Sequence, residues 1–166
     1  MTSESKIVTR AEAAELARRE RDLGHKVVFT NGCFDLLHPA HVRLLEYARA
    51  QGEFLIVAVN SDESVRRLKG PSRPILPARE RARILASLEM VGAVTVFEED
   101  TPAAIIEELE PDVLVKGGDY GPGEVVGEDY VNRRGGVTLR FPTVQGVGTS
   151  AVIRKIVEKF GPSKAG

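Results

Sequence analysis

Five short apolar segments constrain the fold of this 166-residue chain more than any other feature. They are rich in β-branched residues, are separated by stretches with helical patterning, and lie at 26–30, 54–59, 93–97, 113–115 and 137–141. Strands that are apolar on both faces and alternate with helices are typical of parallel sheets covered on both sides. The sequence therefore predicts an α/β fold: a single doubly wound, Rossmann-like domain with a five-stranded parallel sheet.

The intervening stretches carry helix signals. Thr9 begins a capping-box pattern for a helix that ends near Leu23, so residues 1–24 are expected to form an N-terminal helical extension. No linker or low-complexity tract interrupts the rest, and we expect one domain over 1–166. Four further helices are expected to begin near Pro39, Pro77, Thr101-Pro102 and Thr149-Ser150.

Composition excludes several classes of function. The formal net charge of -1 argues against a general nucleic-acid binder. Cys33 is the only cysteine, so no intramolecular disulfide can form. The charged N-terminus has no apolar signal region, and no apolar run approaches the ~20 residues of a membrane span. We therefore expect a cytoplasmic protein with neither a nucleic acid nor a membrane as its partner.

Residues 30–41, TNGCFDLLHPAH, are the most informative for function. This segment leaves the first expected strand, turns at Asn31-Gly32 and enters a helix near Pro39, whose N-terminal amides form an anion site. His38 and His41 are three residues apart and share one face of the first helical turn. Two imidazoles beside a phosphate can donate hydrogen bonds as negative charge builds up in a transition state.

The two histidines, residues 146–151 and Cys33 each allow another interpretation. The two histidines could be half of a metal site, but no third ligand has a suggestive spacing, so no protein-bound metal is expected. Residues 146–151 match a dinucleotide-binding G-x-G-x-x-A pattern, yet no strand with an acidic residue follows about 20 residues on. That segment is better interpreted as a helix N-terminus that receives phosphates. Cys33 is interpreted as a packed residue of the turn and not as a nucleophile.

GCFDLLHPAH resembles the Gly-x-Phe-Asp-x-x-His-x-Gly-His signature of the cytidylyltransferase-like nucleotidyltransferases, relatives of the class I aminoacyl-tRNA synthetases. The resemblance continues through VAVNSDESVRRLKGPSRPI, LVKGGDY and GTSAVIRKI, and so covers nearly the whole chain from Lys26. Within the family, TNGCFDLLH, the VNSD-to-KGP segment and VKGGDY are most similar to the heptose 1-phosphate adenylyltransferases.

The resemblance implies a reaction. AMP would pass from ATP to a sugar 1-phosphate with release of pyrophosphate, and Mg²⁺ would be carried mainly by the ATP phosphates. ATP and a sugar phosphate are thus the expected partners. Two alternatives stay open: a cytidylyltransferase that acts on glycerol 3-phosphate or another alcohol phosphate, and a non-catalytic nucleotide sensor. The assembly is also open, with a homodimer as the candidate.

The resemblance also implies roles for individual residues. The residues expected to stabilise charge in catalysis are His38, His41, Lys69 and Arg81. Those expected to bind the nucleotide are Thr30, Asn31, Gly32, Cys33, Phe34, Gly117, Asp119, Gly148, Thr149 and Ser150. Those expected to bind the acceptor substrate are Asp35, Asp62 and Lys116, although Asp35 could instead orient the turn. Apart from the resemblance, a run of charges is usually a solvated face, and this is expected of Arg66, Arg73, Arg79 and Arg83.

Two positions depart from the family pattern. Ala40 stands where the family has glycine between the histidines, and Gly148-Thr149-Ser150 stands where it has Ser-Thr-Thr. We expect Ala40 to lie on the floor beneath the base or ribose. Its methyl group would then change the pose of the nucleotide or the preference between ATP and CTP.

Overall fold

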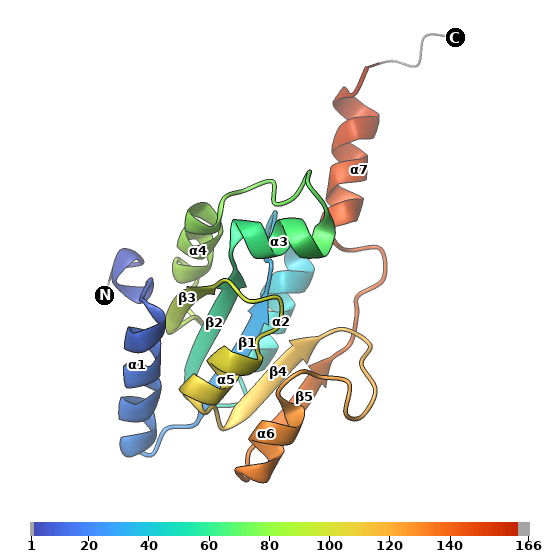
Figure 1. Ribbon diagram of the computed structural model, residues 1–166. Helices are drawn as coiled ribbons and strands as arrows, with labels where there is room; N and C mark the ends of the chain where they lie inside the picture. The colour runs from blue at the N-terminus through green and yellow to red at the C-terminus, as the bar shows by residue number, and fades with distance from the viewer. Residues whose placement is uncertain (1, 163–166) are drawn as a thin grey trace.

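Five parallel strands form one sheet in the order β3-β2-β1-β4-β5 (Figure 1). The computed structural model describes residues 2–162. The strand bounds are β1 Val27–Gly32, β2 Phe54–Asn60, β3 Ala93–Phe97, β4 Val113–Gly117 and β5 Val137–Phe141. This arrangement confirms the predicted five-stranded parallel sheet.

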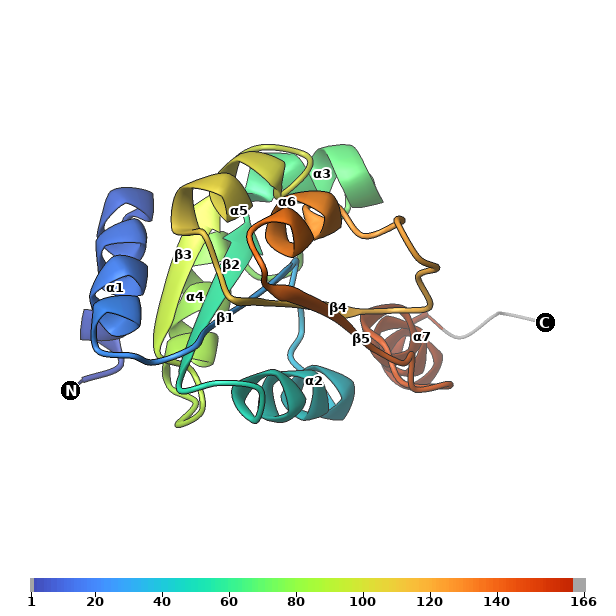
Figure 2. The same cartoon turned by 90° about the horizontal axis from the view of Figure 1, so that it is seen from below.

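Helices cover both faces of the sheet, as expected for strands that are apolar on both sides. One core layer lies under α2 (Pro39–Arg49) and α4 (Ala78–Ala86). The opposite layer lies under α1 (Arg10–Asp22), α5 (Ala103–Leu109) and α6 (Glu128–Arg133) (Figure 2). Alternate residues of one strand enter alternate layers, which confirms the doubly wound architecture.

The N-terminal segment packs onto the sheet. The Thr9 hydroxyl accepts from the Glu12 amide, and the Glu12 carboxylate accepts from the Thr9 amide at 2.7 Å, so the predicted capping box is present. Ala13 and Ala17 of α1 are fully buried against the sheet. Ile7 adds an isolated parallel bridge to Val94. These contacts make the extension a cover for the β3 side of the fold.

Two short helices were not predicted. They are α3 (Asp62–Lys69), which follows β2, and α6. Each buries one apolar residue, Val65 in the first and Val131 in the second, and both are shorter than the ~10 residues over which periodicity identifies a helix. The last helix, α7 (Thr149–Phe160), begins where it was expected. No described helix is both long and apolar enough to cross a bilayer.

Candidate active site

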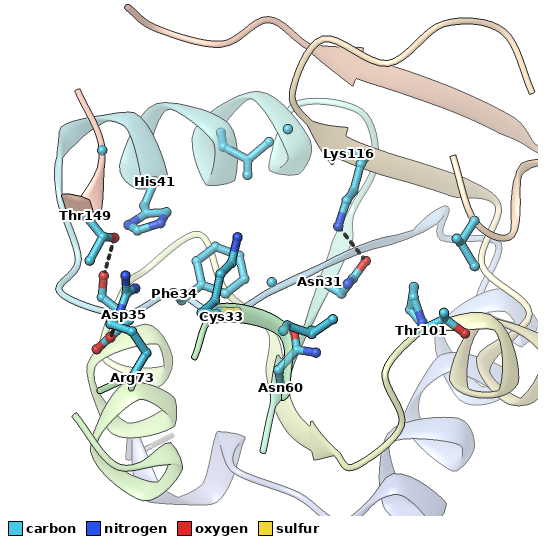
Figure 3. Close-up of a pocket in the computed structure, with 18 of the residues that line it drawn as sticks. Asn31, Cys33, Phe34, Asp35, His41, Asn60, Arg73, Thr101, Lys116 and Thr149 are labelled. Atoms are coloured by element: carbon cyan, nitrogen blue, oxygen red, sulfur yellow. Dashed lines mark hydrogen bonds and ion pairs between the residues drawn. The ribbon is translucent and has the colours of Figure 1, made fainter. Parts of the chain in front are cut away.

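A cavity of about 660 Å³ lies at the carboxyl ends of the strands (Figure 3). Its walls come from the end of β1 and the loop after it, from Asn60 of β2, from Lys116 of β4 and from the start of α7. The chain winds outward from β1 to β3 and then returns to β4 on the other side, so the site lies at the switch point of the sheet. Ligands of open α/β sheets bind at this place.

Most of the predicted site residues line this cavity. They are Asn31, Gly32, Cys33, Phe34, Asp35, His38, His41, Lys69, Lys116, Gly117, Gly148, Thr149 and Ser150. Four predicted residues do not line it: Thr30, Asp62, Arg81 and Asp119.

His38 and His41 form a stacked pair at the N-terminus of α2. Their ring centroids are 3.7 Å apart, and the backbone N–H of His38 donates to Nδ1 of His41 at 3.3 Å. Because Nδ1 accepts, this bond assigns the ring proton of His41 to Nε2. Burial lowers the pKa of His41 to about 4; the charge of His38 lowers it too, and Asp35 opposes the shift. Burial also lowers the pKa of His38. Both imidazoles are therefore neutral N–H donors near pH 7.

The loop before α2 is held by Asp35. Its buried carboxylate accepts from Nε of Arg73 at 2.8 Å and from the amides of Ile75 at 2.7 Å and Leu76 at 3.0 Å. Burial alone would raise the pKa of Asp35, but these hydrogen bonds and the Arg73 charge lower it. With both oxygens engaged, the carboxylate orients the turn, which is the alternative role expected for Asp35; the residue also lines the cavity, and its contact with substrate stays a prediction.

Two residues of the same loop have strained backbone conformations, which the hydrogen bonds to Asp35 hold in place. Phe34 and Leu36 have φ angles of 47° and 51°, in the left-handed region that residues other than glycine rarely adopt. Such conformations persist when surrounding contacts over-determine them, and they cluster at functional sites. The bonds to Asp35, the residue between them, supply those contacts.

Arg73 was expected to be solvated, and that prediction is wrong. Its side chain is only 14% exposed, pairs with the fully buried Asp35 and lines the cavity. The two residues are 38 positions apart, so no local pattern in the sequence signals the pairing.

Arg81 and Asp62 lie beneath the cavity and not in it. The Arg81 guanidinium is buried and donates to the carbonyl oxygens of Cys33 at 2.6 Å and Leu76 at 2.9 Å. It also donates at 2.7 Å to Asp62, which accepts from the amide of Ala78. The expected contacts of Arg81 with phosphate and of Asp62 with substrate are corrected: the pair ties α3 and α4 to the backbone of the cavity loop.

Thr30, Asp119 and Ala40 also lie away from the ligand position. Thr30 is fully buried within the sheet, and Asp119 is exposed and accepts from the Thr143 amide at 3.3 Å. Ala40 is half-buried in the first turn of α2 and is not among the residues that line the cavity. The structure therefore gives no floor position to Ala40, and Thr30 supports the site only from below.

Lys116 brings a half-buried cation to the β4 side of the cavity. Its ammonium group is 3.5 Å from Oδ1 of Asn31 and forms no ion pair with any carboxylate of the described residues (Figure 3). Burial lowers the pKa of Lys116; nearby Cys33 opposes the shift, and Lys69 adds to it. A half-buried ammonium group without a carboxylate partner is suited to an anionic ligand.

The start of α7 closes the opposite side. Gly148, Thr149 and Ser150 line the cavity, and the Thr149 hydroxyl donates to the carbonyl oxygen of Asp35 at 2.7 Å (Figure 3). The N-termini of α2 and α7 therefore meet at one cavity, and each presents backbone amides and a positive dipole end to an anion.

Two helix N-termini, stacked neutral histidines and a half-buried lysine at the switch point define a phosphate-binding α/β domain of the nucleotide-binding class. The chain belongs to the cytidylyltransferase-like family, whose model matches residues 29–129.

Similar proteins agree with this assignment. The chain is 49% identical to the bifunctional protein HldE of Trichlorobacter lovleyi over 95% of its own length. It is 52% identical to HldE of Koribacter versatilis over 92% of its length. In both comparisons it spans only 32% of the relative, about a third of the length of these curated proteins.

Solved structures share the fold. A lipopolysaccharide core biosynthesis protein from Thermoplasma volcanium matches with a TM-score of 0.62 and 26% identity, over 74% of this chain and all of that one. A pantoate–β-alanine ligase from Francisella tularensis matches with a TM-score of 0.54 over 90% of this chain and 72% of that one. At 14% identity the second match shows the fold alone.

Proposed function

We propose that this chain transfers AMP from ATP to a sugar 1-phosphate, with D-glycero-β-D-manno-heptose 1-phosphate as the acceptor, and releases pyrophosphate and ADP-heptose. The observation that carries the proposal is the stacked pair of His38 and His41, which faces the same cavity as Lys116. Similarity to HldE proteins and to a lipopolysaccharide core biosynthesis protein supports the choice of sugar.

The proposed reaction is an in-line displacement at the α-phosphorus of ATP. A phosphate oxygen of the acceptor forms the new bond to that phosphorus, and the bond to the bridging oxygen of pyrophosphate breaks. The acceptor phosphate is already ionised, so no general base is needed. This agrees with the engaged state of Asp35, whose oxygens are all occupied by Arg73, Ile75 and Leu76.

The proposed roles divide the cavity between the two substrates. Neutral His38 and His41 donate N–H groups to the phosphate oxygens as charge develops, and Thr149 and Ser150 do so from the start of α7. Lys69, exposed at the end of α3, neutralises the triphosphate at the cavity mouth. Lys116 holds the phosphate of the acceptor.

We propose that Mg²⁺ arrives with the nucleotide. No group of three or more potential metal ligands occurs among residues 2–162, and Asp100 and Glu124 are the cavity carboxylates besides the engaged Asp35. This donor set fits Mg²⁺, which keeps several waters and binds through substrate phosphates and one or two carboxylates. The ion would supply charge neutralisation on the phosphates.

Two further proposals concern the setting. We propose that the enzyme works in the cytoplasm, where ATP is available, and that it acts as a homodimer. The exposed apolar surface of α7 supports the dimer.

The family description favours one competing function, transfer of CMP from CTP to an alcohol phosphate. A pyrophosphate-release screen of ATP and CTP against heptose 1-phosphate, other sugar 1-phosphates and glycerol 3-phosphate separates the two. We expect release with ATP and heptose 1-phosphate, and its loss in a His41→Ala control. Preference for CTP and glycerol 3-phosphate would overturn the proposal, and binding of ATP without release would indicate a nucleotide sensor.

A further inference from the structure

Helix α7 carries an apolar stripe that its own chain leaves uncovered. Ile153, Ile156, Val157 and Phe160 follow the spacing of one helix face. Ile156 is 48% exposed, Val157 61% and Phe160 82%, and no residue of α7 is buried. Figure 1 shows α7 projecting beyond the sheet. Monomeric proteins seldom present such a continuous apolar face to water.

The same chain has a groove with complementary properties. It is a shallow, open depression of about 480 Å³ along the first turns of α2. Leu37, Pro39 and Val42 give it an apolar floor, and Arg43 and Glu46 give it one charge of each sign. A groove with apolar anchors and a charged rim is the surface that an amphipathic helix recognises.

The charges of the two surfaces also match. Arg43 and Glu46 form no ion pairs within the part of the chain that the structure describes, and neither do Lys155, Glu158 and Lys159 of α7. A helix seated in the groove can bring Glu158 toward Arg43, and a lysine toward Glu46, at the rim. Such rim pairs add little affinity but set orientation and partner choice.

We propose that α7 of one copy docks its apolar face in the α2 groove of a second copy, and the second copy does the same in return. Helix and groove occur on one chain, so a twofold dimer forms both contacts at once and leaves neither surface open. This inference rests on the homodimer of the proposed function and deepens it, and it does not depend on which substrates the enzyme uses.

The dimer would also complete the catalytic cavity. His38 lines both the groove and the cavity, and α7 begins with Thr149 and Ser150 of the phosphate site. Docking therefore fixes the direction of α7 and supports His38 from behind.

The test is the mass in solution of the full chain by light scattering. The wild-type protein is expected at twice 18.1 kDa. Phe160→Glu places a charge in the docked face and should raise the dimer dissociation constant at least ~100-fold, since two phenylalanines leave the interface. Leu23→Glu is the matched control: Leu23 is 68% exposed at the end of α1, and its variant should remain dimeric.

Mixing two variants tests the groove itself. Val42→Glu damages only the groove and Phe160→Glu only the helix, so each alone should be monomeric. A mixed pair keeps one intact helix–groove contact, and dimers should reappear at concentrations between those of the wild type and the single variants. Val42→Ser, a smaller polar change at the same position of the groove floor, replaces Val42→Glu if circular dichroism shows that Val42→Glu is unfolded.

The possible results distinguish three claims: the homodimer, the docking of α7, and the α2 groove as its site. A monomeric wild type at tens of micromolar would overturn both the homodimer and this inference. A dimer that Phe160→Glu leaves intact would overturn the docking of α7 alone. A dimer that Phe160→Glu breaks, without recovery on mixing, would mean that α7 packs on another surface, and the groove assignment would fail. Pyrophosphate release measured on the same samples reports on the proposed reaction separately.

Discussion

The cavity has one wall that is fixed and one that is barely attached. The loop at residues 33–38 is braced by three hydrogen bonds to the Asp35 carboxylate and by Arg81 on the Cys33 carbonyl. The segment at 142–160 reaches the same cavity through the Thr149 hydroxyl, and its helix buries no residue. The histidine side is thus organised before any ligand binds, whereas few contacts within the same chain hold the α7 side in place.

The largest predicted effect is the loss of stability when the hydrogen bonds that brace the histidine wall are removed. Asp35→Ala leaves the Arg73 guanidinium and two backbone amides without their acceptor, and should lower the free energy of unfolding by about 3–5 kcal/mol in urea titrations. Asp119→Ala is the control, because that exposed carboxylate accepts one amide bond and should cost under about 1 kcal/mol. Equal losses in the two variants would contradict the bracing role.

The second prediction concerns the chemistry that this wall supports. His38→Ala and His41→Ala should each lower kcat by ~10²–10³, because their N–H bonds strengthen as charge develops. ATP affinity, measured by calorimetry, should change much less. His25→Ala serves as control, since His25 pairs with Glu20 at the surface. Near-normal turnover of either active-site variant would make that histidine structural.

Some features of the cavity walls could be predicted from the sequence, and others could not. The strands, the switch point and the histidine pair follow from local patterns: β-branched runs and the spacing of His38 and His41. The partners of Asp35 and Arg81 could not be predicted, because Arg73, Leu76 and Cys33 reach them only after α3 and α4 fold back on the loop. The basic stretch at 66–83 indicates positive charge near the site, but it does not indicate which of its arginines is buried.

The third prediction concerns the stability of the folded chain at acid pH, which depends on the protonation of His41. The pKa of His41 is about 4 in the folded chain and near 6.5 when unfolded, so the unfolded chain binds the extra proton between these values. Stability should therefore fall as pH falls from 6.5 to 4, by up to ~3 kcal/mol. Denaturant titrations of the wild type and His41→Asn across this window measure the difference. Parallel pH profiles would show that His41 is not desolvated.

The smallest effect is expected at Ala40. Because this residue does not line the cavity, Ala40→Gly should leave the KM for ATP and the ATP-to-CTP preference unchanged. It should lower stability by up to ~1 kcal/mol, since glycine is the poorer helix residue. Steady-state kinetics with both nucleotides and a thermal melt decide the matter. A changed nucleotide preference would restore the close approach expected from sequence.

The central claim is that an acceptor phosphate attacks the α-phosphorus of ATP in this cavity. The direct measurement uses heptose 1-phosphate with ¹⁸O in its phosphate group and mass spectrometry of both products. We expect ADP-heptose that keeps all of the label and pyrophosphate that carries none. Label in pyrophosphate, or formation of AMP without a nucleotide sugar, would contradict it.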